Sequence, residues 1–432
     1  MKHTLIATAF CLLMPSLAFA YGEGETIPMV ARAVHLLTNA ARADTKYALK
    51  ECGKMCRPDE HYASSLPPFY WSQCLENAAQ MYANLVGPFE CPDHDSPCTI
   101  KPSIYKDYPK TCQGQASCAC ADKLKCDTSR GKYTERIAGF CRSQNYNTYG
   151  ENLLMTHDFY DDAVFLVNMW LHEDGYKNSG HRENLLSPKL NLAGYGIYKG
   201  TLIQDLGHKN YIETYSITSG AVFSDGRNSY FGFHFYDNLH TVKQAIIHAE
   251  NRGCYEMSLQ IGKSQNGLYL ININDLQLQN SMACTPFNFE VQLENGVTLR
   301  YPQTGSLMYG NCGARSWASN QLPTCFKSNQ KSYLVDDISS DIVPAKPFKI
   351  DDLFSEYTRM KRVVETVQKA PNVTDEVVKI ISSVPSDSAV RTQTITSTTE
   401  VVKVKQCQLV TYDENDNVVG VEIVDCNSQP SR

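Results

Sequence analysis

Gly150-Glu151-Asn152-Leu153-Leu154 opens the stretch from which the architecture follows, and Trp170-Leu171-His172-Glu173 and Gly180-His181-Arg182-Glu183-Asn184-Leu185-Leu186 continue it. Between the first two runs, Asp158 can cap a helix in which Val164, Val167 and Leu171 recur at helical spacing. Gly175 and Gly180 end that helix, and an apolar strand with Gly194 and Gly196 follows. The pattern predicts two carboxylates and a histidine on one side of a sheet.

These runs resemble the motifs of the CAP superfamily (cysteine-rich secretory proteins, antigen 5 and pathogenesis-related proteins, which share the SCP domain), particularly its bacterial-type members. Gly150-Glu151-Asn152 resembles the family's G-E-N motif, Trp170 to Glu173 its W-x-x-E, and Gly180-His181-Arg182 with Asn184 its G-H-R-x-N. Asn39 and Arg42 resemble the N-x-x-R of its first helix, and Cys91 to Asp95 resembles C-x-x-H-[ST], with Asp95 in place of the hydroxyl residue. The resemblance covers residues 26–223 and implies an α+β fold, a three-layer α-β-α sandwich.

The first twenty residues predict export from the cell. Lys2 and His3 precede an apolar run from Leu5 to Leu17, and Ala18-Phe19-Ala20 is typical of a cleavage site. The run is too short for a transmembrane anchor. We therefore expect a signal peptide over residues 1–20, no transmembrane anchor, and a mature protein that is secreted or periplasmic.

The cysteines agree with an oxidising compartment. Removal of Cys11 with the signal peptide leaves sixteen of the 17 cysteines, ten between Cys52 and Cys141 and six between Cys254 and Cys426. An even number in an exported chain indicates disulfides formed within domains. A net charge of −6 without a basic patch excludes nucleic acid as a partner.

The helices and loops of the first half can be placed along the chain. Residues 26–50 are predicted to be a long helix, and Phe69-Tyr70-Trp71-Ser72 leads into a second, alanine-rich helix. Residues 95–148 form a Cys-rich insertion, which we expect to be a disulfide-stapled loop rather than a separate domain. Strands are expected at Leu192–Tyr198 and Tyr211–Thr218, joined by a turn at Gly207–Asn210.

The hydrophobic period changes to two in residues 224–340. Phe287, Phe289, Val291 and Leu293 alternate with polar residues, and Asn295-Gly296 predicts a hairpin turn. Met257, Leu259 and Ile261 alternate too, before a second turn signal at Asn266-Gly267. These closely spaced strands predict an immunoglobulin-like β-sandwich that Cys254, Cys284, Cys312 and Cys325 would staple.

Residues 341–432 are expected to add a linker, an amphipathic helix and a hairpin. Pro344 and Pro347 lie in the linker, and Leu353, Tyr357, Met360, Val364 and Val367 form the apolar seam of a short helix. Cys407 and Cys426 flank Asp416-Asn417 symmetrically, so a two-residue loop there would place a disulfide across a hairpin.

The resemblance also carries over a site. His94, Glu151, Glu173 and His181 match the two histidines and two glutamates that line the family's central cleft, where some members bind a divalent metal. His94 and His181, with Glu151 and Glu173, are therefore the candidate ligands for zinc. The alternative for Glu151 is a structural role as a buried hydrogen-bond acceptor. His157 or His172 could take the place of His94. Gly150, Asn152, Trp170, Gly180, Arg182 and Asn184 are motif positions with expected structural roles.

Three functions remain open at this stage. The first is a non-enzymatic, exported CAP protein that binds a lipid or sterol, a cell-wall component or an extracellular protein in or near the cleft. The second is a metal-dependent, peptidase-like hydrolase that uses His94, Glu151, Glu173 and His181. The third is an interaction protein that acts through the insertion or the β domain. An H-E-x-x-H zincin motif is absent because position 176 is Tyr, and no nucleophile can be assigned.

Overall fold

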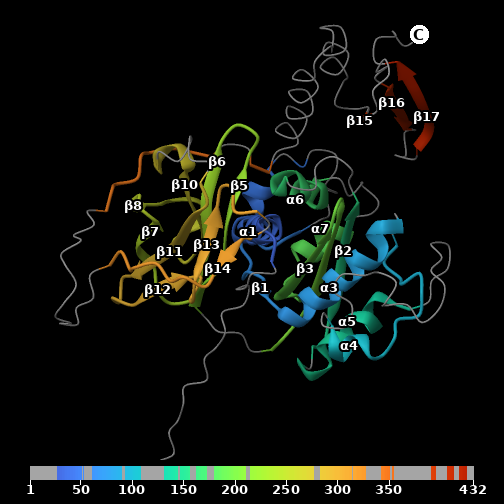
Figure 1. Ribbon diagram of the computed structural model, residues 1–432, viewed down its shortest axis with the longest axis horizontal. Coiled ribbons are helices and arrows are strands. Elements are labelled where there is room, and N and C mark those ends of the chain that lie inside the picture. The colour runs from blue at the N-terminus through green and yellow to red at the C-terminus, as the bar shows by residue number, and fades with distance from the viewer. Residues whose placement is uncertain are drawn as a thin grey trace, which may run out of the picture.

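The computed structural model describes residues 27–50, 52, 61–89, 93–108, 131–144, 146–155, 162–172, 180–210, 215–276, 283–313, 315–326, 342–350 and 353–354, and the backbone of three strands within 391–425 (Figure 1). The predicted signal peptide, Glu173, His157 and most of the predicted C-terminal helix lie outside these residues. No helix among the described residues is long and apolar enough to cross a membrane.

The first half contains a four-stranded sheet between two layers of helices, as the resemblance implies. Its strands β1(Tyr70–Trp71), β2(Tyr149–Met155), β3(Leu192–Tyr198) and β4(Thr201–Gly207) lie in the order β1-β3-β4-β2. Helix α3(Gln73–Val86) covers one face, and α1(Met29–Ala43), α6(Ala163–His172) and α7(Gly180–Leu185) lie toward the other (Figure 1). The prediction of a three-layer α-β-α sandwich is confirmed.

The alternation of residues along β3 explains how the helices pack on this sheet. Ala193 and Tyr195 point toward α1 and α6 and belong to their core. Gly194 and Gly196 point toward α3, and a Cβ atom on Gly194 would lie 2.0 Å from the backbone nitrogen of Glu76. Glycine is needed here because the helix backbone rests directly on the strand.

The partner of β3 was predicted wrongly. The second strand is β4(Thr201–Gly207), which pairs with β3 from Leu192↔Gly207 to Tyr198↔Thr201. Lys199, with φ 49°, and Gly200 make the turn. The segment predicted at Tyr211–Thr218 belongs instead to β5(Tyr215–Ser224), a strand of the β-sandwich.

The described parts of the insertion contain helices, which the prediction of a disulfide-stapled loop did not include. Helix α4(Ile104–Asp107) and helix α5(Tyr133–Cys141) pack beside α3. A disulfide joins Cys74 of α3 to Cys141 of α5. The four other cysteines in the middle of the insertion lie outside the described residues, namely Cys112, Cys118, Cys120 and Cys126. The insertion is therefore anchored to the first half instead of forming a unit of its own.

The second half is a β-sandwich of immunoglobulin-like topology. One sheet has the order β5-β6-β10-β9, and the other has the order β14-β13-β11-β7-β8, with β12 paired to β11. The strands after β5 are β6(Ser229–Asp237), β7(Val242–Ala249), β8(Gly253–Glu256), β9(Ser258–Lys263), β10(Asn266–Asn272), β11(Thr285–Leu293), β12(Thr298–Tyr301), β13(Ser306–Tyr309) and β14(Trp317–Ala318). The first sheet reproduces the A-B-E-D order of an immunoglobulin domain, and β13-β11-β7 reproduces G-F-C.

Aromatic side chains fill the sandwich, and disulfides fasten its ends. Phe231 of β6 meets Phe287 of β11 with ring centroids 4.6 Å apart. The predicted staples pair as Cys254–Cys325 and Cys284–Cys312. The hairpin predicted around Asn295-Gly296 is confirmed, with Gly296 at φ 85°. The turn predicted at Asn266-Gly267 is displaced, because both residues already pair with β9.

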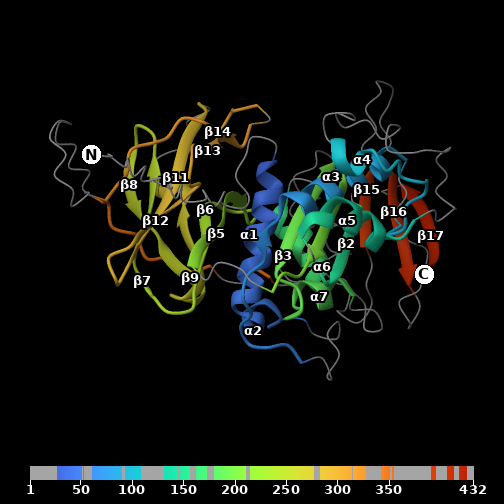
Figure 2. The same cartoon turned by 90° about the horizontal axis from the view of Figure 1, so that it is seen from below.

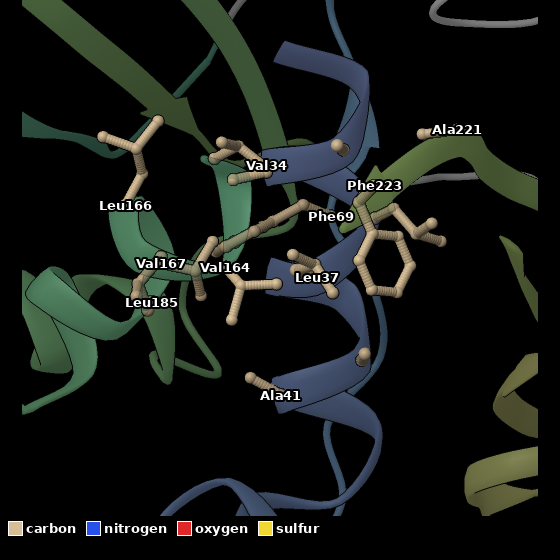
Figure 3. Packing of buried hydrophobic residues seen from close by; sticks show 14 of the residues in the cluster. Val34, Leu37, Ala41, Phe69, Val164, Leu166, Val167, Leu185, Ala221 and Phe223 are labelled. Carbon is tan, nitrogen blue, oxygen red and sulfur yellow. The ribbon is translucent and has the colours of Figure 1, made fainter. Parts of the chain in front are cut away.

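Helix α1 is shared between the two halves. Every residue from Ala31 to Ala43 is buried. Val34, Leu37 and Ala41 meet α6 on one side, and Ala221 and Phe223 of β5 approach from the other (Figure 3). In Figure 2, α1 lies between the sandwich and the α-β-α layers. One continuous core therefore runs through both halves.

A segment that we call the strap, residues 342–350 with 353–354, ties the halves together. It was predicted to be a linker. Val343 forms a bridge with Tyr255 of the sandwich. Ile350, Leu353 and Phe354 are buried in the core that contains α1 and α6. Because the strap is hydrogen-bonded to the sandwich at one end and buried beside α1 and α6 at the other, it restrains the two halves relative to each other.

The C-terminal sheet has three strands, one more than the predicted hairpin. β15(Arg391–Ile395), β16(Gln406–Tyr412) and β17(Val418–Asp425) lie in the order β15-β16-β17. Cys407 is opposite Val424, and Tyr412 is paired with Val418, so the two-residue loop at Asp416-Asn417 is wrong. Cys426 lies outside the described residues, and its disulfide with Cys407 stays a prediction.

Candidate functional site

Two members of the predicted tetrad are in contact. Nδ1 of His94 lies 2.8 Å from Oε1 of Glu151. Glu151 belongs to β2, and its side chain is fully buried, whereas 46% of the His94 side chain is exposed. The hydrogen bond to Glu151 raises the pKa of His94 above its usual value, against the effect of partial burial. The pair thus presents a solvent-accessible imidazole backed by a buried carboxylate.

The insertion supplies the counter-charge of Glu151. Arg136 of α5 is buried, and its Nη2 pairs with Oε2 of Glu151. Its Nη1 donates to the backbone carbonyl of His94 at 3.1 Å. The guanidinium also lies over the ring of Tyr82, 3.5 Å from the centroid. Burial opposes ionisation of Glu151, but the charge of Arg136 and the bond from His94 lower its pKa overall. Glu151 is therefore ionised, with both oxygens engaged.

A second buried carboxyl group lies beside Glu151. Asp205 of β4 is directly opposite Glu151 of β2, and it has no exposed surface. Burial first, and then the charge of Glu151, raises the pKa of Asp205 well above its usual value. Neither carboxyl oxygen of Asp205 has a hydrogen-bond partner among the residues that the structure describes. Burial beside the charge of Glu151 therefore favours the protonated form of Asp205 over its carboxylate.

The other motif residues hold the backbone around β2. Asn184 of α7 donates to the carbonyl of Glu151 at 3.1 Å and to Oδ1 of Asn152 at 2.8 Å. Asn152 donates to Gln204 at 2.8 Å and to the carbonyl of His181 at 3.3 Å. A Cβ atom on Gly150 would lie 3.1 Å from Oδ1 of Asn184. These residues fasten α7, which carries His181, to the strand that carries Glu151.

The remaining family positions stabilise the helices. Arg42 donates to the carbonyls of Pro67, Leu185, Ser187 and Leu190. Asn39 exchanges two hydrogen bonds with the backbone of Phe69. Arg182 donates to the carbonyl of Leu171 at 2.7 Å, and Trp170 is fully buried. Gly180 is the first residue of α7. Their predicted structural roles agree with these contacts.

The rest of the tetrad is described only in part. His181 is half-buried at the start of α7, beside β2. Glu173 lies outside the described residues, as does His157, and the alternative His172 is buried at 2% exposure. Of the two candidates that the structure describes, His94 contacts Glu151.

Histidine and carboxylate are the residue types that zinc prefers, and a zinc site here stays a prediction. Glu151 is fully buried, and its two oxygens already hold His94 and Arg136, so its contacts are those of a support for His94. His94 uses Nδ1 for Glu151, and metal-binding histidines commonly bond a carboxylate in this way while the other ring nitrogen coordinates. Over the described ranges, the three ligand atoms that approach within 4.8 Å of one another belong to His248, Cys254 and Cys325, whose cysteines are joined as a disulfide. The described ligand atoms of His94, Glu151 and His181 do not form such a group, and His94 and His181, with Glu151 behind His94, stay the predicted residues for a zinc ion.

Sequence reasoning missed Arg136 and Asp205. Arg136 lies in a short amphipathic run in which Tyr133, Ile137 and Phe140 recur at helical spacing, so the helix could have been found. Asp205 is an acid within an otherwise buried strand, a pattern that points to a special role. Placing either side chain beside Glu151 needed the fold.

The comparisons with known proteins give one family match. Residues 36–211 match the family model CAP, the cysteine-rich secretory protein family. Among solved structures, the chain is similar to an extracellular protein containing an SCP domain from Bacillus anthracis str. Ames, solved at 1.5 Å, with 21% identity and a TM-score of 0.23. That match covers 33% of this chain and 35% of the other, about a third of its length. The comparison with curated proteins found no match.

Proposed function

Residues 36–211 form a domain of the CAP family, and from this premise we propose that the chain is an exported CAP protein that binds a ligand without catalysing a reaction on it. Disulfides in both halves, Cys74–Cys141 and Cys254–Cys325 among them, support export because such bonds persist in oxidising compartments. The ligand classes are a lipid or sterol, a cell-wall component or an extracellular protein. The immunoglobulin-like sandwich adds a second surface for a macromolecular ligand.

The state of Glu151 is the observation that carries this proposal. A general base must accept a proton, and a metal ligand must present an oxygen to the ion, whereas the Glu151 side chain is fully buried. Glu151 has a lowered pKa, and both of its oxygens are engaged by His94 and Arg136. The carboxylate is thereby held as a support for His94. This role suits the binding of a ligand better than the catalysis of a reaction.

A metal-dependent hydrolase is the second candidate. The pair of His94 and Glu151 favours it, since this is the arrangement in which a histidine is oriented for a metal. Zinc would supply a polarised water for attack on a peptide bond. This candidate needs Glu173 to act as the general base in place of Glu151.

Zinc titration of the oxidised protein, beside His181→Ala, tests the site first. Stoichiometric binding that His181→Ala abolishes would establish His181 as a ligand, and the same loss in His94→Ala would establish His94. Peptide cleavage that is lost both on chelation and in Glu173→Gln would overturn the proposal and establish the hydrolase. The proposal predicts no such cleavage, and capture by phosphatidylcholine vesicles with sterol, or by cell-wall fragments, that persists under both conditions.

A further inference from the structure

We propose that Arg136, contributed by helix α5 of the insertion, is the positioning residue of His94 and makes the binding site depend on the insertion. This inference rests on the proposed function, because it takes His94 as part of the ligand site. The Cys-rich insertion then acts as a wall of the site that sets the orientation of its exposed imidazole.

One guanidinium holds His94 from two directions. Nη1 of Arg136 donates to the carbonyl of His94 at 3.1 Å and so holds the backbone. Nη2 pairs with Glu151, whose other oxygen lies 2.8 Å from Nδ1 of His94 and so holds the ring. The three contacts thus connect the backbone of His94 to its own side chain through Arg136 and Glu151. Moving Arg136 would release both ends of the residue.

The loop around His94 depends on the same part of the insertion. The backbone nitrogen of Ser96 donates to the carbonyl of Gly131 at 2.7 Å. The backbone nitrogen of Tyr133 donates to the side chain of Asp95 at 3.3 Å, and its ring centroid lies 6.0 Å from that of His94. The segment that leads into α5 thus contacts the two residues that follow His94 and the ring of His94 itself.

The geometry requires arginine and not merely a positive charge. Two acceptors in different directions are reached by two nitrogens of one planar group, which an ammonium cannot do at the same distance from the backbone. The same plane lies over the ring of Tyr82, whose hydroxyl donates to the carbonyl of Asp95 at 3.0 Å. Tyr82 therefore packs against the guanidinium and fastens the His94 loop at once.

Helix α5 is itself held in place by covalent and packing contacts, so the backbone position of Arg136 is fixed. The disulfide from Cys141 to Cys74 ties its last turn to α3. Ile137 is fully buried. The ring of Tyr105 packs directly on Gly139, since a Cβ atom added there would lie 2.6 Å from a carbon of that ring. Reduction of the disulfide would loosen the helix that supplies Arg136.

The test is the tautomer of His94 in the ligand-free protein, read from nitrogen chemical shifts of 15N-histidine at alkaline pH. Wild type should show the Nδ1–H tautomer, because Nδ1 faces the acceptor Glu151. Arg136→Met and Arg136→Lys should both give a mixture of tautomers, and His94 and Asp95 should show shifted amide signals. Arg142→Met, an exposed arginine in the turn after α5, is the matched control and should leave the His94 signals unchanged.

Zinc alone serves as the probe of the site where wild type binds it. Removing a group that orients a ligand typically lowers metal affinity about 10- to 100-fold, so Arg136→Lys should weaken zinc binding by that order while Arg142→Met should not. A folded Arg136→Lys or Arg136→Met protein with the wild-type His94 signals would overturn the inference. If Arg136→Met does not fold, Arg136→Lys decides, since it keeps the charge that Glu151 needs. A failure of the proposed function would instead appear in the ligand and cleavage assays, with the His94 signals still sensitive to Arg136.

Discussion

Glu76 links the protonation of a single buried residue to the stability of the fold. Its carboxyl group accepts from Nε1 of Trp71 at 2.8 Å, and burial raises its pKa from 4.5 to about 7. The raised pKa means that the folded state favours the proton. The contribution is therefore complete below pH 4.5 and is lost as the pH rises toward about 7.

Glu76→Gln should remove this pH dependence. Relative to the variant, wild type should lose roughly 3 kcal/mol of unfolding free energy between the two ends of that window, because one pKa unit corresponds to about 1.4 kcal/mol. Urea unfolding on either side of the window measures the difference. Glu135→Gln, at an exposed position of α5, is the control. Equal pH profiles for wild type and Glu76→Gln would show that Glu76 is ionised throughout.

Single residues were predictable where a motif carried them. His94 and Glu151 were matched from separate motifs, and they are in contact. Arg136 was not predictable, because its partner depends on how an insertion of unknown fold packs against β2. The position of Asp205 could be predicted only with the register of β4 against β2. An error of one residue in that register would have placed the Asp205 side chain on the other face of the sheet.

At the scale of elements, the contact between β3 and α3 depends on glycine. A Cβ atom on Gly194 would lie 2.3 Å from the carbonyl carbon of Leu75, a backbone atom that cannot move without displacing the helix. Gly194→Ala should therefore lower the unfolding free energy by about 1–3 kcal/mol or more, as overpacking does. Gly131→Ala is the matched control, because its Cβ atom would meet nothing within 4 Å. A Gly194→Ala protein with the urea midpoint of Gly131→Ala would contradict this close packing.

Elements were predictable where their period was clear. The alternation of residues 287–301 predicted the β11–β12 hairpin correctly. β4 was missed because glycine and asparagine, which are typical turn residues, occur at Gly207 and Asn210. The turn that follows β3 uses Lys199 instead, at φ 49°. Lysine is uncommon in that conformation, so the strand that follows it was not recognised. Turn composition alone could not decide between the two positions.

At the scale of the whole molecule, the two halves share a helix that the sequence pattern assigned to only one of them. Asn39 donates to Phe69 in the first half and, at 3.3 Å, to the hydroxyl of Thr218 in the sandwich. Arg32 donates to Ser316 at 3.2 Å and to Tyr301 at 3.4 Å, both in the sandwich. Helical periodicity identifies buried positions but not the elements that bury them. An immunoglobulin-like sandwich was predicted from strand spacing, whereas its strand order and the shared core were not.

This arrangement predicts that the CAP half does not fold alone. A fragment of residues 27–210 would expose the side of α1 that Ala221, Phe223 and Leu270 now cover, and would leave the side chain of Arg32 without Ser316 and Tyr301. Exposed apolar surface and the loss of these two hydrogen bonds both oppose folding. We expect the oxidised fragment to aggregate or to melt without a cooperative transition, while a chain of residues 27–354, which keeps the strap, should unfold in one transition. A cooperative, soluble 27–210 fragment would show that the halves are independent domains. Calorimetry of the two fragments side by side distinguishes these outcomes.

Tyr47→Phe tests the strap separately. The Tyr47 hydroxyl donates to the carbonyl of Ile350 at 3.0 Å. Because the variant loses this hydrogen bond, its unfolding free energy should fall by about 1 kcal/mol, which urea unfolding measures.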